Sequence, residues 1–198
     1  MKLVSILLAS LLCLLPCSQA LAVNASESPD MKPLPVGAAA PDLTLPAPAA
    51  AKEAAELGLP ASATTFRLAD LKADAVVLVV FSMYCTYCQK EAPSLAKLHA
   101  LIRERGLSGK LKLIGLGAGN SAYEVNVFRE TYKLSLPLVE DPDYAAHKAL
   151  GQVGTPFYYV LARQGQGFVI VDEQLGRVDS MEQFLKAVQD KTGLSGRK

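Results

Sequence analysis

Two cysteines three positions apart are the residues of this chain with the clearest potential for chemistry. Cys85 and Cys88 lie in the stretch FSMYCTYCQKEAP, residues 81–93. Two thiols at this spacing can exchange electrons with a disulfide, bind a soft metal ion, or close a small structural ring. Neighbouring segments and distant motifs have to distinguish these chemistries.

The segments that flank the pair predict how it is positioned. Residues 75–81 (AVVLVVF) are an uninterrupted apolar run rich in valine, which is typical of a strand buried on both faces. Residues 86–105 predict a helix, which Gly106 ends. Cys85 is then expected at the helix N-terminus, where free N–H groups and the helix dipole favour the thiolate. Cys88 would lie one turn further on and act as the resolving thiol.

Structural and metal-binding roles for the pair fit less well than redox chemistry. A ring this small removes little entropy from the unfolded chain and stabilises weakly. A structural zinc site needs four ligands, and the two histidines, His99 and His147, are far apart in the sequence. The stretch from Met83 does match the Met-x-Cys-x-x-Cys pattern of copper-carrying domains. A soft-metal carrier therefore stays open as the alternative, although such domains are much shorter.

The N-terminal residues predict export. Lys2 precedes an apolar run over residues 3–15, too short for a comfortable membrane span, and small residues follow. We expect a signal peptide over residues 1–20, with cleavage as late as residue 25. A retained membrane anchor and lipidation at Cys17 are the alternatives. Cleavage leaves Cys85 and Cys88 as the only cysteines of the four, in a periplasmic or other extracytoplasmic compartment that permits disulfides.

Composition predicts one globular domain after a short linker. The chain has 198 residues, of which 51% are hydrophobic, and 20 basic side chains balance 19 acidic ones. This balance argues against a nucleic-acid partner, which would need a basic surface. Residues 21–36, with three prolines and no apolar period, predict a flexible linker before a domain over 37–198. Whether the alanine-rich segment 46–63 is ordered is left open.

The order of elements predicts an α/β domain. Strands and helices alternate, which implies a mostly parallel sheet with helices on both faces, and a closing hairpin adds an antiparallel edge. The expected strands are 75–81, 111–116, a short one in LPLVEDPD (136–143), 157–161 and 168–171; the expected helices are 86–105, 121–132, 144–150 and 181–191.

A second motif lies far along the chain. Thr155 and Pro156 precede a buried strand, and a proline in such a place is often cis. Beside the cysteine helix, this loop would present a free backbone edge to an extended partner. Tyr158 and Tyr159 alternate on the strand that follows, so one is expected in the core and the other beside the groove at Pro156.

Together these features resemble the thioredoxin fold, and more closely the TlpA/ResA-like extracytoplasmic thiol-disulfide oxidoreductases of the thioredoxin superfamily. The resemblance covers roughly residues 36–191. In that group LPLVEDPD would belong to a strand–helix insertion before the cis-proline. The other matching positions are Gly37, Ala40, Pro41, Asp42 and Leu43, the stretch 68–72, and Glu91 and Pro93 after the cysteine pair.

The resemblance implies an enzyme that uses the Cys85–Cys88 disulfide as its redox group, with no metal or organic cofactor. It implies protein substrates with disulfides or dithiols, a reducing role such as cytochrome c maturation, and a membrane thiol as electron donor. Cys85 would be the nucleophile and Cys88 the resolving thiol. Glu91 would serve the pair as an acid, or else lie exposed in the first helical turn. The implied substrate-binding residues are Tyr84, Thr86, Tyr87, Thr155 and Pro156.

The chain also departs from the family pattern. Tyr84 stands where a tryptophan usually precedes the first cysteine, and the dipeptide between the cysteines is Thr86-Tyr87. Because this dipeptide tunes the thiols, the reduction potential does not carry over from the family. A peroxiredoxin signature would need proline and threonine at the positions of Leu78 and Ser82, so that activity is not expected.

Overall fold

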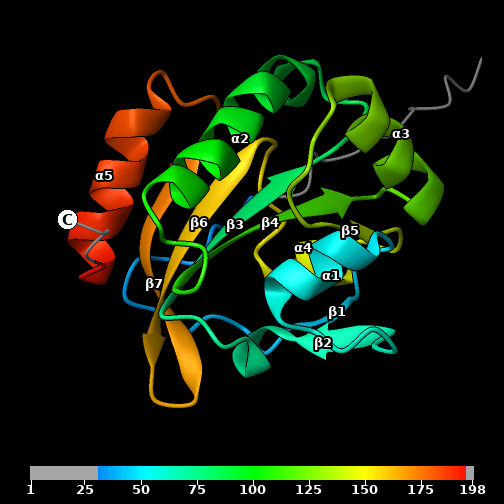
Figure 1. The fold of residues 1–198 in the computed structure, drawn as a ribbon. Coiled ribbons are helices and arrows are strands. Elements are labelled where there is room, and N and C mark those ends of the chain that lie inside the picture. The colour runs from blue at the N-terminus through cyan, green and yellow to red at the C-terminus, as the bar shows by residue number, and fades with distance from the viewer. Residues whose placement is uncertain (1–30, 195–198) are drawn as a thin grey trace, which may run out of the picture.

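The computed structural model describes residues 31–194 and shows a central five-stranded sheet in the order β5-β4-β3-β6-β7 (Figure 1). The neighbours β3, β4 and β5 are parallel, whereas β6 is antiparallel to both β3 and β7. The predicted sheet, with its antiparallel C-terminal hairpin, is therefore confirmed. The strands are β3 (Ala75–Phe81), β4 (Leu111–Ala118), β5 (Leu138–Asp141), β6 (Phe157–Gln164) and β7 (Gly167–Leu175). The predicted signal peptide lies outside the described residues.

Helices pack on both faces of this sheet, as predicted. The helices α2 (Thr86–Glu104), α3 (Ala122–Tyr132) and α5 (Met181–Thr192) contribute to one hydrophobic cluster. The opposite cluster includes residues from the short helices α1 (Ala51–Leu57), α4 (Ala145–Ala149) and η1 (Leu68–Asp70). It also includes the two-stranded sheet of β1 (Thr44–Pro46) and β2 (Thr65–Arg67).

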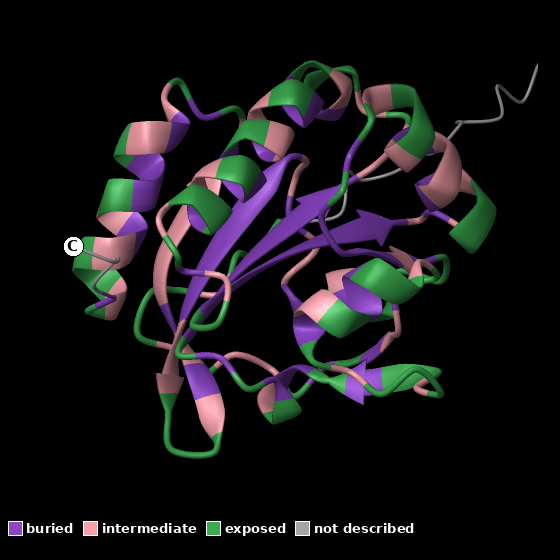
Figure 2. Cartoon of the chain, in the orientation of Figure 1, coloured by how far each residue is buried: buried purple, intermediate pink, exposed green. Residues whose placement is uncertain are grey.

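Strand β3 divides its side chains between the two clusters. Residues 75, 77, 79 and 81 face one cluster and residues 76, 78 and 80 face the other, and all are fully buried. Figure 2 shows the central strands buried and the exposed residues on the outer helix faces and loops. A strand covered on both sides needs apolar residues at every position, which explains the unbroken run in the sequence.

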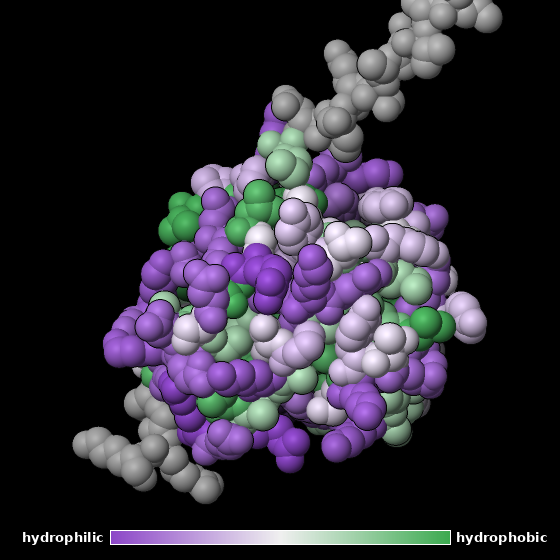
Figure 3. All heavy atoms as spheres, turned by 90° about the horizontal axis from the view of Figure 1, so that it is seen from above, coloured by the Kyte–Doolittle hydropathy of each residue, from purple (hydrophilic) through white to green (hydrophobic). Residues whose placement is uncertain are grey.

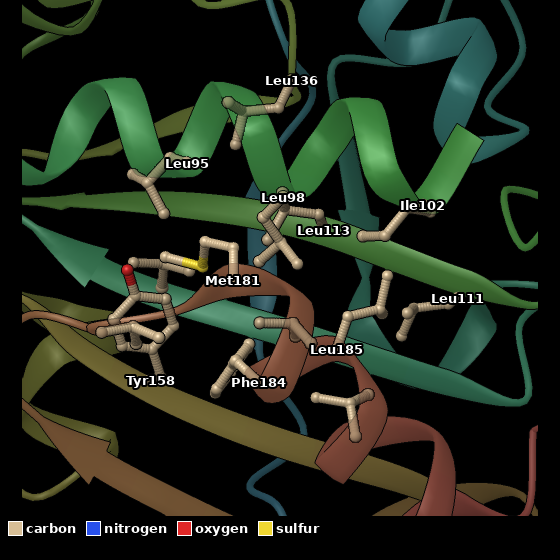
Figure 4. Packing of buried hydrophobic residues seen from close by; sticks show 14 of the residues in the cluster. Leu95, Leu98, Ile102, Leu111, Leu113, Leu136, Tyr158, Met181, Phe184 and Leu185 are labelled. Atoms are coloured by element: carbon tan, nitrogen blue, oxygen red, sulfur yellow. The ribbon is translucent and has the colours of Figure 1, made fainter. Parts of the chain in front are cut away.

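The cysteine helix α2 is anchored to α5 and to the sheet by side chains at helical spacing. Leu95, Leu98 and Ile102 point from α2 into the cluster, where they meet Phe184 and Leu185 of α5 (Figure 4). This packing holds the N-terminus of α2, and with it the cysteine pair, against the end of β3.

Polar strand ends account for the main difference from the predicted boundaries. The sequence predicts a strand over 168–171, whereas β7 continues to Leu175. The added residues 172–175 are half-buried or exposed, so their hydrophobicity does not reveal the strand. They nevertheless pair with residues 157–160 of β6, beyond an irregularity at which the register shifts by one residue.

The described part of the predicted linker is bound to the domain, so the linker prediction is wrong for residues 32–36. The Lys32 N–H donates to the Gly151 carbonyl at 2.8 Å, and the Leu34 N–H donates to the Tyr159 hydroxyl at 3.1 Å. Residues 37–40 then pair with the outer edge of β7, through N–H and C=O groups of residues 168 and 170. Backbone pairing of this kind requires no apolar period, so no sequence pattern indicates it.

The alanine-rich segment 46–63 contains α1 and is held by buried charges. Arg129 donates to both oxygens of the buried Glu53 carboxylate, at 2.8 and 3.0 Å, and the Leu138 N–H adds a bond at 3.3 Å. Burial raises the pKa of Glu53, although Arg129 opposes this effect. In the same helix, Glu56 contacts the His99 ring at 2.6 Å. These contacts fix α1 against α2, α3 and β5.

The face of the molecule seen in Figure 3 is mostly polar. Seen from above the view of Figure 1, hydrophobic residues form small separate patches among hydrophilic ones (Figure 3). Within residues 31–194, no helix is long and apolar enough to cross a membrane.

Candidate active site

The two cysteines differ sharply in exposure. Cys85 occupies the N-cap position of α2 and is half-buried, whereas Cys88 lies within the helix and is only 1% exposed. Both are free thiols, and each shifts the pKa of the other. The structure thus places Cys85 where a partner can reach it and Cys88 behind it, as the sequence predicts.

Contacts around Cys85 favour its thiolate. Burial raises the pKa of Cys85, but the Thr155 side chain and the N–H groups of Tyr87 and Cys88 stabilise the thiolate. Together these bonds outweigh burial and lower the pKa below its ordinary value. In the protonated state, the Cys85 Sγ donates instead to the Thr155 carbonyl oxygen at 3.2 Å.

Cys88 behaves in the opposite way. Burial raises the pKa of its thiol to about 12, and the neighbouring Cys85 adds to this effect, while the Ser82 backbone opposes it. Of the two thiols, Cys85 therefore loses its proton more readily, and Cys88 holds its proton more strongly.

Asn120 holds the turn that leads into Cys85. This role of Asn120 was not predicted from the sequence. Its Oδ1 accepts a bond from the Met83 N–H at 2.8 Å, and the Gln89 side chain donates to the Met83 carbonyl at 2.8 Å. Asn120 is fully buried after β4, and its Nδ2 has no partner among the described residues. The sequence does carry a signal for Asn120, because it is a polar residue that follows the buried strand β4, the neighbour of β3.

The second motif lies beside the first, as predicted. The Thr155–Pro156 peptide bond is cis, Pro156 is buried, and the Thr155 carbonyl contacts Cys85. The Gly176 N–H donates to the Pro156 carbonyl at 2.8 Å and connects this loop to the segment between β7 and α5.

The remaining predicted binding residues lie on the surface around Cys85. Tyr84 and Tyr87 are 67% and 63% exposed, and Thr86 is accessible as well. The Tyr84 hydroxyl donates to the Glu124 carboxylate, and this bond raises the pKa of Tyr84. Tyr84 thus contacts the first turn of α3, leaving the ring open to solvent.

Glu91 is completely buried, so the alternative of an exposed first-turn glutamate is wrong. Its Oε1 accepts bonds from the Tyr158 hydroxyl at 2.7 Å and from the Val178 N–H at 3.0 Å. Its Oε2 accepts a bond from Arg177 Nε at 3.1 Å. Because Glu91 follows Cys88 by three residues on α2, the two side chains share one face of the helix.

Two partners of Glu91, Tyr158 and Arg177, were not predicted from the sequence. Tyr158 and Tyr159 are both fully buried, so neither lines the groove at Pro156. The Tyr159 hydroxyl donates to the Leu150 carbonyl at 2.8 Å, whereas the Tyr158 hydroxyl is turned toward α2 (Figure 4). A buried tyrosine needs a hydrogen-bond partner, which was a usable signal for Tyr158. Nothing in the sequence pattern marks Arg177.

The described residues contain no group of three or more His, Cys, Asp or Glu side chains placed to hold a metal ion. Cys85 and Cys88 supply two soft ligands. Met83, the methionine of the copper-carrier pattern, is half-buried and packs against the hydrophobic cluster.

Comparison with known proteins agrees with this geometry. The chain is 26% identical over 180 residues to the thiol-disulfide oxidoreductase ResA of Oceanobacillus iheyensis, an alignment that covers 90% of this chain and 86% of that protein. StoA from Bacillus subtilis superposes with a TM-score of 0.56 at 19% identity, covering 76% of this chain and 98% of StoA. A secreted disulfide oxidoreductase of Mycobacterium tuberculosis superposes with a TM-score of 0.53 at 18% identity, covering 75% and 96%.

The structural matches establish the fold, and the family model establishes the relationship. The model of the AhpC/TSA family matches residues 36–178, which include the cysteine pair, the cis-proline loop and Glu91. The chain belongs to the AhpC/TSA family and has the thioredoxin fold of thiol-disulfide oxidoreductases such as ResA.

Proposed function

We propose that this protein is an exported thiol-disulfide oxidoreductase that reduces disulfides in partner proteins. The observation that carries the proposal is the contrast between its thiols. The accessible Cys85 has a lowered pKa beside the cis-proline loop, whereas the pKa of the buried Cys88 is raised to about 12. A nucleophile at the surface with a protected second thiol behind it suits two-step thiol exchange.

In the first step, the Cys85 thiolate attacks one sulfur of the partner disulfide. A bond forms between Cys85 and that sulfur, and the other partner sulfur leaves as a thiolate, which takes a proton. In the second step, Cys88 loses its proton and attacks the Cys85 sulfur. The Cys85–Cys88 bond forms, and the remaining partner sulfur leaves and is protonated. Two electrons pass to the partner. A membrane thiol donor then restores the reduced pair.

The surface around Cys85 supplies the proposed partner site. Thr155 and Pro156 would align an extended partner segment, and the accessible Tyr84, Thr86 and Tyr87 would contact its side chains. Their accessibility leaves these groups available to a macromolecule.

Glu91 is the proposed acceptor for the Cys88 proton. A carboxylate offers about four acceptor positions, and three positions on Glu91 are occupied by Tyr158, Val178 and Arg177. One position on Oε2 stays open.

Trapping of mixed disulfides tests the activity. In Cys88→Ala, the second step cannot occur, so Cys85 should accumulate as mixed disulfides with proteins of the export compartment, and a reductant should release them. The matched control is the double variant Cys85→Ala/Cys88→Ala, which should trap nothing. Absence of trapped partners, together with tight stoichiometric binding of Cu(I) by the reduced protein, would support the soft-metal alternative instead.

The direction of electron flow and a role in an assembly pathway such as cytochrome c maturation are further parts of the proposal. The predicted signal peptide and the resemblance to ResA support them. Measuring the reduction potential of the pair tests the direction. A potential near that of thioredoxin, about −270 mV, fits a reductant, whereas one near that of DsbA, about −120 mV, would indicate disulfide formation.

A further inference from the structure

The buried carboxylate of Glu91 receives its bonds from two segments far along the chain. Tyr158 belongs to β6, while Arg177 and Val178 lie between β7 and α5. Arg177 is the partner that brings a positive charge, since Tyr158 and Val178 contribute neutral donors.

Arg177 also connects Glu91 to solvent. Its side chain is 48% exposed, whereas that of Glu91 is 0% exposed. The backbone that carries Arg177 is fixed on both sides, because the Gly176 N–H binds the Pro156 carbonyl and the Val178 N–H binds Glu91. The guanidinium is therefore held at the boundary between the buried acid and water.

We propose that Arg177 is a positioning residue for the second step of thiol exchange: it holds Glu91 as a carboxylate one helical turn from Cys88, ready to accept the Cys88 proton. This inference rests on the function proposed above. In the step, the Cys88 S–H bond breaks, the proton binds Glu91 Oε2, and the Cys88 thiolate attacks the Cys85 sulfur. Glu91 later passes the proton to water along the exposed side of Arg177.

The reason lies in the cost of burying a charge. A buried carboxylate without a cation or enough donors takes up a proton, and a protonated acid cannot serve as the base. Tyr158 cannot replace Arg177 in this role. Burial and the bond to Glu91 raise the pKa of its phenol, so it remains a neutral donor. Among the described residues, the ionisable or charged side chains that hydrogen-bond Glu91 are Tyr158 and Arg177, and Cys88 lies one helical turn away on the same face of α2.

The experiment separates the two steps with an aromatic disulfide, 5,5′-dithiobis(2-nitrobenzoate), as probe. Attack by Cys85 on the probe releases one yellow thiolate, and attack by Cys88 on the resulting mixed disulfide releases a second. Both phases are followed against pH in the full chain and in Arg177→Gln. Lys97→Gln is the matched control, because Lys97 forms an exposed ion pair with Glu182 between the same helices, α2 and α5.

Arg177→Gln should leave the first phase unchanged and slow the second by up to about tenfold on the acidic side of its pH profile. This corresponds to a shift of the acidic limb by about one pH unit, which is modest because the ion pair is half-exposed. Arg177→Lys should restore part of the rate, since it keeps the charge but loses the planar donor geometry. In a Glu91→Gln background, Arg177→Gln should slow the second phase no further. Lys97→Gln should match the wild type.

Other outcomes would overturn the inference. A second phase with the wild-type pH profile in folded Arg177→Gln would do so, and so would equal slowing in the Glu91→Gln background. Should Arg177→Gln fail to fold, a wild-type profile in Arg177→Lys would likewise contradict the inference. A wild-type protein that shows no second phase would instead contradict the proposed function itself.

Discussion

Two buried carboxylates, each paired with an arginine, serve opposite sides of the sheet in different ways. Glu53 lies in α1 near the β5 edge, and Glu91 lies in α2 near β6 and the segment after β7 (Figure 1). Arg129 donates hydrogen bonds to both oxygens of Glu53, and the Arg129 side chain is 12% exposed. Glu91 receives one bond from Arg177, whose side chain is 48% exposed.

The difference in exposure and bonding between Glu53–Arg129 and Glu91–Arg177 indicates different roles for the two ion pairs. A forked, enclosed ion pair leaves no route for a proton and can only fix α1 in place. An acid that its arginine contacts through one bond, with that arginine half-exposed, has the arrangement that the proposed proton transfer requires. Burial and a nearby arginine therefore do not by themselves make a carboxylate functional. A half-exposed arginine partner and a cysteine one helical turn away distinguish Glu91 from Glu53.

Loss of Arg129 should produce the largest effect on stability. Arg129→Ala leaves Glu53 buried without its cation, and we expect a loss of about 3–5 kcal/mol in the free energy of unfolding at pH 8. Because burial raises the pKa of Glu53, the loss should shrink as the pH falls and the carboxyl becomes protonated. Urea unfolding at pH 8 and at a lower pH measures both effects.

Arg67→Ala is the control for this comparison, because Arg67 pairs with Asp42 at the exposed surface, so its loss should change the free energy of unfolding far less. If Arg129→Ala cost no more than this control, the α1 ion pair would not be the structural anchor that its geometry indicates.

Alkaline pH should lower the free energy of unfolding of the reduced protein through Cys88. The folded protein keeps the Cys88 proton to a pKa of about 12, whereas the unfolded chain loses it near pH 9, so stability falls as the pH rises between these values. By pH 10.5 the reduced protein should lose about 2 kcal/mol through Cys88. Lys112 beside α1 should act in the opposite direction, since burial lowers its pKa.

Cys88→Ala isolates this contribution in unfolding measurements from pH 8 to pH 10.5. Over this range the variant should lose about 2 kcal/mol less of its free energy of unfolding than the reduced wild type does. Parallel curves for the two proteins would show that Cys88 is not held as a neutral thiol.

The smallest expected effect concerns Cys85. Thr155→Val removes the hydroxyl that stabilises the thiolate and keeps the carbonyl, so the pKa of Cys85 should rise by less than about one unit. Ultraviolet absorbance of the thiolate against pH measures the shift. Thr86→Val is the control, since Thr86 is a threonine next to Cys85 in the chain and is exposed to solvent. An unchanged pKa in Thr155→Val would assign the low value to the helix backbone alone.

The parts of the molecule that depend on local pattern could be predicted from the sequence. Continuous apolar residues identified β3, helical spacing identified α2, and the positions of Cys85 and Pro156 brought the two motifs together. The contacts of Glu91 could not be predicted. They depend on Arg177 and Tyr158, which approach from segments more than sixty residues away, and no local period encodes the approach of one polar group to another.

Backbone pairing escaped prediction for a related reason. The segment 37–40 follows β7 through main-chain bonds, which are nearly independent of side-chain type. Polar strand ends in β7 are defined by their partner β6 rather than by their own composition. Both cases show that strand pairing can extend beyond the hydrophobic residues that reveal it.

The pairing of residues 37–40 along β7 also bears on how this protein avoids aggregation. An uncovered edge strand offers a row of N–H and C=O groups on which another chain can assemble. Here Gly37, Ala38 and Ala40 occupy those groups on residues 168 and 170. A shortened chain that began after Ala40 would keep both thiols, yet it would expose β7 to other copies of itself. The segment thus covers this part of the β7 edge with backbone from the same chain.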